Sequence, residues 1–63
     1  MAAPYTAAEK LACAERELKM RVRVYPRWVA GGKMSQAKAD AEIAIMREIV
    51  ADYAKASEGE RLL

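Results

Sequence analysis

Residues 20–35 read MRVRVYPRWVAGGKMS and join two stretches that each have the pattern of an amphipathic α-helix. This segment holds the only Trp, Trp28, and the only Gly-Gly pair, Gly31-Gly32. A glycine just after the last apolar position favours a left-handed helix end, and Ser35 suits the N-cap of the next helix. A short connection predicts that the two helices are antiparallel neighbours. We therefore predict an all-α fold, an antiparallel helical hairpin with its turn at residues 31–35.

The first helix is expected from about residue 7 to residue 30. Thr6 and Glu9 have the spacing of a capping box, which marks a helix start. Because the apolar stripe stays in phase across Pro26, we expect the helix to continue with a kink there, a break being the alternative. Residues 21–25 also alternate like a β-strand, so a strand within 20–30 would refute the hairpin. The stripe consists of Ala7, Leu11, Ala14, Leu18, Val22, Tyr25 and Val29.

The second helix is expected from about residue 36 to residue 56. The run Ser57-Glu58-Gly59-Glu60 predicts its end, and residues 61–63 are expected to form a loose tail. Glu42 falls inside the apolar arc, where it either reaches the edge or pairs with an arginine of the first helix. The apolar positions are spaced by three and four residues and are Ala39, Ile43, Met46, Val50 and Tyr53, widened by Ile45, Ile49 and Ala54.

The small size of the chain favours self-association. A single domain of 63 residues buries little apolar surface, and the lone Cys13 excludes an intramolecular disulfide. A second apolar stripe on the first helix consists of Cys13, Met20 and Val24, flanked by Trp28. It has two interpretations, scattered exposed side chains or a contact with another subunit. We predict a homodimer that forms a four-helix bundle. The expected core is Leu18, Val22, Tyr25, Ile43, Met46 and Val50. The expected intersubunit layer is Met20, Val24, Trp28, Ile45 and Ile49.

Residues for catalysis are scarce. The chain has no His, the commonest general base, and the position of Cys13 in the second stripe indicates a packed thiol. No glycine-rich phosphate loop is present, so we expect no enzyme activity, no cofactor and no metal site. No apolar run is long enough to span a bilayer, and the first residues lack the features of a signal peptide. The prediction is a soluble cytoplasmic protein.

Positive charge is concentrated in the first helix. The net charge is +2, but residues 1–33 carry +4 and residues 34–63 carry −2. Arg16, Arg23 and Arg27 align on one side of the helix, where they can pair with acids of the second helix, bind an acidic protein or contact nucleic acid. Arg and Trp often anchor protein interfaces. The candidate partner-binding residues are Arg16, Met20, Arg23, Val24, Arg27 and Trp28.

The run RVYPRWV at residues 23–29, followed by Gly32, Lys33 and Met34, resembles short helical proteins encoded in phage and prophage genomes. Their pattern is RVYPRWV-x-x-G-[RK]-M, and the resemblance covers most of residues 15–54. It assigns no role to any residue, but it implies a context. Small phage proteins without catalytic residues often bind a host protein and inhibit or redirect it, in host takeover or against host defence. The alternative is a nucleic-acid-binding accessory protein that uses the basic face of the first helix. The resemblance implies the cytoplasm of a bacterial host as the location.

Overall fold

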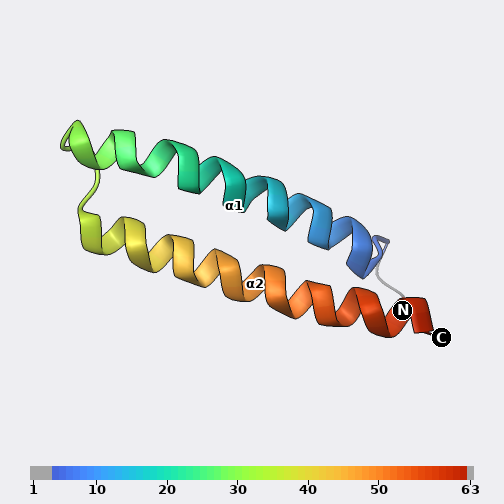
Figure 1. The fold of residues 1–63 in the computed structure, drawn as a ribbon. Coiled ribbons are helices and arrows are strands. Elements are labelled where there is room, and N and C mark those ends of the chain that lie inside the picture. The colour runs from blue at the N-terminus through green and yellow to red at the C-terminus, as the bar shows by residue number, and fades with distance from the viewer. Residues whose placement is uncertain (1–3, 63) are drawn as a thin grey trace.

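The computed structural model describes residues 4–62 and contains two helices, α1 (Ala7–Ala30) and α2 (Gln36–Leu62). The helices lie side by side and antiparallel, with the turn at one end and the start of α1 beside the end of α2 at the other (Figure 1). The molecule is a rod of 47 × 19 × 16 Å. The predicted all-α hairpin is confirmed, and residues 20–30 are helical throughout, so the strand alternative is excluded.

The start of α1 is capped from two directions. The Thr6 hydroxyl accepts from the Glu9 amide at 3.1 Å, and the Glu9 carboxylate accepts from the Thr6 amide at 3.0 Å, which confirms the capping box. The Ala7 amide donates to both carboxylate oxygens of Glu60 in α2, at 3.0 and 3.1 Å. A carboxylate at this position also interacts favourably with the α1 dipole.

The contact of Glu60 explains why α2 is longer than predicted. The expected end at residues 57–60 and the expected tail at Arg61 and Leu62 are wrong, because α2 continues to Leu62. The positions of α2 that face α1 recur at Tyr53, Ser57 and Glu60. The last turns of α2 therefore stay packed against α1, and this packing keeps them helical. Leu63 lies outside the described residues.

Pro26 lies inside α1, and the helix passes through it. The alternative of a break is therefore excluded, whereas the predicted kink stays a prediction. Pro26 has no amide hydrogen to donate to the Val22 carbonyl, so α1 lacks one backbone hydrogen bond at this turn.

The turn between the helices is a Schellman motif. The amide of Gly32 donates to the Val29 carbonyl at 3.1 Å, and that of Lys33 donates to the Trp28 carbonyl at 2.9 Å. Gly32 has a φ of 74°, in the left-handed region that favours glycine. Ser35 then caps α2, since its hydroxyl accepts from the Lys38 amide at 3.1 Å. The predicted glycine helix end and serine cap are both confirmed.

The core between the helices is thin. Among the described residues, the buried side chains are those of Ala7, Ala14, Tyr25, Ala39 and Met46. Tyr25 and Met46 confirm the prediction, but the other expected core residues are more exposed. Leu18, Ile43 and Val50 are only half-buried, and Val22 is 44% exposed.

The exposure of Val22 has a physical cause. Contact positions on α1 pass from Leu18 to Arg21 and then to Tyr25, in steps of three and four residues. Arg21 thus takes the position that the apolar pattern gave to Val22, and Val22 lies to one side of the contact line.

Candidate functional site

The outer face of α1 carries the predicted arginine row. Arg16, Arg23 and Arg27 are exposed and follow each other at seven and four residues, so they share the side of α1 that faces away from α2. Within residues 4–62, every ion pair within 4.0 Å has Arg21, Lys38 or Arg61 as its cation. The interpretation in which the row pairs with the acids of α2 is therefore not supported.

Apolar side chains accompany this row. Met20 and Val24 are half-buried, and Trp28 is 40% exposed. The Trp28 ring stacks on the buried Tyr25 ring, with 5.4 Å between centroids and 27° between planes. This stacking holds Trp28 in place while part of its surface stays accessible. Arg16, Met20, Arg23, Val24, Arg27 and Trp28 thus form one surface, which we call the α1 outer face.

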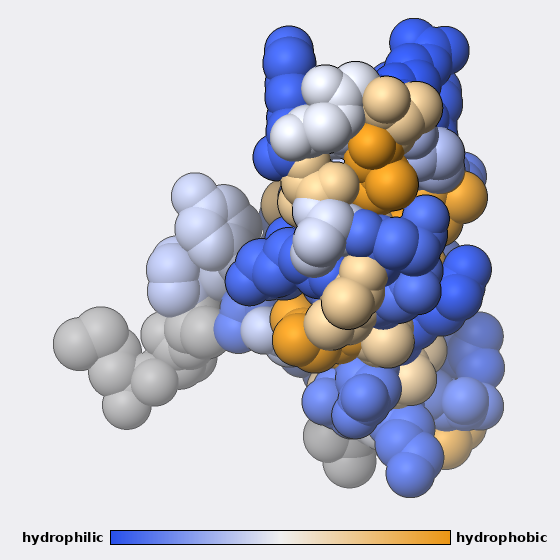
Figure 2. Space-filling model, turned by 90° about the vertical axis from the view of Figure 1, so that its left-hand side faces the viewer, coloured by the Kyte–Doolittle hydropathy of each residue, from blue (hydrophilic) through white to orange (hydrophobic). Residues whose placement is uncertain are grey.

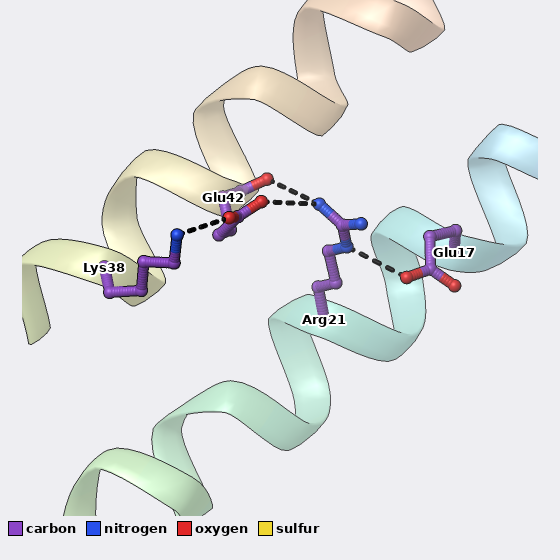
Figure 3. Close-up of polar contacts among 4 residues, drawn as sticks. All are labelled: Glu17, Arg21, Lys38 and Glu42. Carbon is purple, nitrogen blue, oxygen red and sulfur yellow. Dashed lines mark hydrogen bonds and ion pairs between the residues drawn. The ribbon is translucent and has the colours of Figure 1, made fainter. Parts of the chain in front are cut away.

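Between the helices, a charged cluster sets how α1 lies on α2 (Figure 3). Arg21 Nε donates to the Glu17 carboxylate at 2.9 Å, and Arg21 Nη1 donates to the Glu42 carbonyl oxygen at 2.9 Å. The Glu42 carboxylate lies 3.5 Å from Arg21 Nη1 and 3.0 Å from Lys38 Nζ. Of the two alternatives for Glu42, pairing with an arginine of the first helix is confirmed.

The pKa values of this cluster shift as the contacts require. The Lys38 side chain, with a smaller contribution from Arg21, lowers the pKa of Glu42 below its ordinary value. The hydrogen bond with Glu17 is the main reason that the pKa of Arg21 is raised. Arg21 also lies 5.9 Å from the centroid of the Tyr25 ring. The sequence predicted an arginine of the first helix as one possible partner of Glu42 but did not identify it as Arg21. The signal available in the sequence was that Arg21 lies three residues after Leu18, a spacing that keeps both on the contact side of the helix.

Two surface hollows lie near Cys13. One, of about 490 Å³, is lined by residues of the α1 start, including Tyr5, Cys13 and Arg16. The other, of about 360 Å³, lies between the helices and includes Cys13, Met46 and Ile49. Cys13 is exposed, so the expected packed thiol is wrong for the single chain. In the described part of the chain, no three His, Cys, Asp or Glu side chains gather as metal ligands.

Comparison with family models, curated proteins and solved structures finds no match for this chain. The resemblance to phage and prophage proteins therefore stays a prediction. Neither α1 nor α2 combines the length and apolar character that crossing a bilayer requires.

Proposed function

We propose that this chain is a non-catalytic, phage-derived protein that binds an acidic surface of a host protein through the α1 outer face. Binding inhibits or redirects that host protein in the bacterial cytoplasm. The protein acts as a homodimer whose two hairpins form a four-helix bundle.

One observation carries the binding proposal: three exposed arginines stand beside a tryptophan that is both fixed and accessible. Arg16, Arg23 and Arg27 have no carboxylate of the described residues within ion-pair distance. Their guanidinium groups are thus available for bidentate contacts with carboxylates. Trp28 is held by Tyr25, so it loses little side-chain freedom on binding. Arginine steers and orients an acidic partner, and tryptophan supplies buried area.

The mixture of residue types favours protein over nucleic acid as the partner. Met20 and Val24 lie beside the arginines on the α1 outer face, so the positive charge borders an apolar strip. Nucleic-acid binders usually present a denser basic patch, and the net charge here is only +2.

The homodimer is supported by the surface that the single hairpin leaves exposed. The accessible surface of the chain is 4954 Å². A compact monomer of 7.0 kDa is expected to expose about 4,000 Å². The excess of about 900 Å² is close to what one partner buries in an interface of standard size, about 800 Å². Seen from the turn end, hydrophobic residues reach the surface between hydrophilic ones (Figure 2).

The test is capture of partners from a host lysate, with and without nuclease. The bait is the wild-type chain, Arg23→Glu/Arg27→Glu, or a control of equal charge on α2, Lys55→Glu/Arg61→Glu. We expect a specific protein that resists nuclease, is retained by the control and is lost with the Arg23 and Arg27 reversals. The Trp28→Ala variant should also fail to capture this protein.

Two outcomes would overturn the proposal. One is recovery of nucleic acid alone, with an affinity that falls steeply as salt is raised, which would establish the nucleic-acid alternative. The other is a set of captured proteins that is the same for the α1 reversals and for the α2 control.

A further inference from the structure

The hairpin has two long flanks, one on each side of the contact between α1 and α2. Cys13 and Ile49 line a hollow on one flank, and Leu11 and Ala54 line a hollow on the other. Leu11 and Cys13 are about 200° apart around α1, so these hollows open to different sides. We call the flank with Cys13 and Ile49 the Cys13 flank, and the flank with Leu11 and Ala54 the Leu18 flank. Helical spacing extends the Cys13 flank to Met20, Val24 and Ile45. It extends the Leu18 flank to Leu18, Val22, Ile43 and Val50.

The flanks differ in charge. The Cys13 flank includes Lys10 and Glu17, and the cluster of Arg21 with Glu42 lies along it. A second hairpin on this flank would take that cluster out of water, which is costly unless every charge stays paired. On the Leu18 flank, Leu18, Ile43 and Val50 are half-buried and Val22 is 44% exposed. Its centre is apolar, and its charges, which include the Glu58–Arg61 ion pair beside the hollow near the end of α2, stand at the rim.

From this difference we infer that a second copy of the chain covers the Leu18 flank, with the two turns at the same end. The inference rests on the homodimer proposed above and names its interface. The sequence predicted Met20, Val24, Trp28, Ile45 and Ile49 as the intersubunit layer. This inference instead places at the interface four residues predicted for the core, Leu18, Val22, Ile43 and Val50. The excess accessible surface of about 900 Å² for the whole hairpin is close to the roughly 800 Å² that each partner buries in an interface of standard size.

The rim charges favour this orientation. Arg21 is level with Glu42, and Ala7 is level with Glu60, so Glu15 is about level with residue 50, within one turn of Arg47. With both turns at one end, α1 packs on α2 of the second copy, and Glu15 approaches Arg47 of that copy twice about the two-fold axis. With the turns at opposite ends, α2 packs on α2, and Arg47, near the middle of α2, approaches its own symmetry mate. The first arrangement pairs opposite charges and the second opposes like charges.

This dimer leaves the α1 outer face free. Met20, Val24 and Trp28 lie toward the Cys13 flank and beside Arg16, Arg23 and Arg27, away from the second copy. The same side chains are therefore not needed for both dimerisation and partner binding. Each dimer presents two copies of the α1 outer face, on opposite sides of the bundle.

The test compares two valines of α1 that are two residues apart. Sedimentation equilibrium is run on the wild type, Val22→Glu and Val24→Glu, and circular dichroism monitors helix content. We expect the wild type to dimerise at micromolar concentration. Val22→Glu should weaken dimerisation by more than about 100-fold, because it buries an unpaired charge. Val24→Glu should change it by no more than about twofold, because the half-buried Val24 lies toward the Cys13 flank, away from the second copy.

If Val22→Glu loses its helix content, Val22→Thr replaces it, because threonine keeps the shape of valine. Val22→Thr should still weaken the dimer more than Val24→Thr does. Glu15→Arg should weaken the dimer as well, and Glu15→Arg/Arg47→Glu should restore it. A dimer dissociated by Val24→Glu as much as by Val22→Glu, or not restored by the double reversal, overturns this inference while the homodimer stands. A wild-type monomer overturns the homodimer itself.

Discussion

The two adjacent glycines of the turn allow a sharp test of the fold, because only one of them needs to be glycine. Gly32 has a φ of 74°, and an L-residue there costs about 1–2 kcal/mol. Alanine also restricts the unfolded chain, which returns about 0.4–1 kcal/mol. Gly32→Ala should therefore destabilise the protein by about 1 kcal/mol. Gly31 has a φ of −84°, and a Cβ there would lie 3.4 Å from the Arg27 carbonyl oxygen, an ordinary contact. Gly31→Ala should be neutral or stabilise by up to about 1 kcal/mol.

Urea denaturation followed by circular dichroism measures both free energies of unfolding. The two variants and the wild type must be compared at one chain concentration, because self-association makes stability depend on concentration. The slope against urea should not change, since neither substitution alters the surface exposed on unfolding. If Gly31→Ala is destabilised as much as Gly32→Ala, the left-handed residue is not Gly32 and the Schellman geometry is wrong.

Two further predictions concern the ends of the hairpin and its charged cluster. Glu60→Ala should destabilise the protein by about 1 kcal/mol in urea denaturation, because it removes the acceptor of the Ala7 amide. The control Glu58→Ala, which loses only an exposed ion pair with Arg61, should change stability by less than about 0.5 kcal/mol, and equal losses would refute the cap. Since Lys38 lowers the folded-state pKa of Glu42, its stabilisation is present above the unfolded-state pKa and is lost as pH falls through the folded-state pKa. The melting temperature of the wild type should fall on acidification below about pH 4.5, and that of Glu42→Gln should fall less steeply. Equal declines of the two melting temperatures would contradict this.

The secondary structure was predictable because its signals are local. Thr6 with Glu9, the Gly31-Gly32 pair and Ser35 each act on the backbone within five residues, and all three form as expected. The end of α2 was not predictable in this way. Gly59 and its polar neighbours weaken the helix locally, but Glu60 contacts the start of α1, 53 residues away in sequence. A tertiary contact thus outweighs a local propensity.

The assignment of core and surface failed for a related reason. Apolar periodicity identifies which side of a helix is hydrophobic, but it does not locate the centre of the contact to within one residue. On α1 the centre passes through Arg21, whose guanidinium group finds acceptors on Glu17 and on the Glu42 backbone. That placement turns Val22 toward the Leu18 flank. A shift of one position therefore decides which apolar side chains remain for a second copy. It also leaves Arg16, Arg23 and Arg27 on the side of α1 that the hairpin does not use. In a hairpin with so thin a core, the polar residue at the contact determines where the remaining surfaces face.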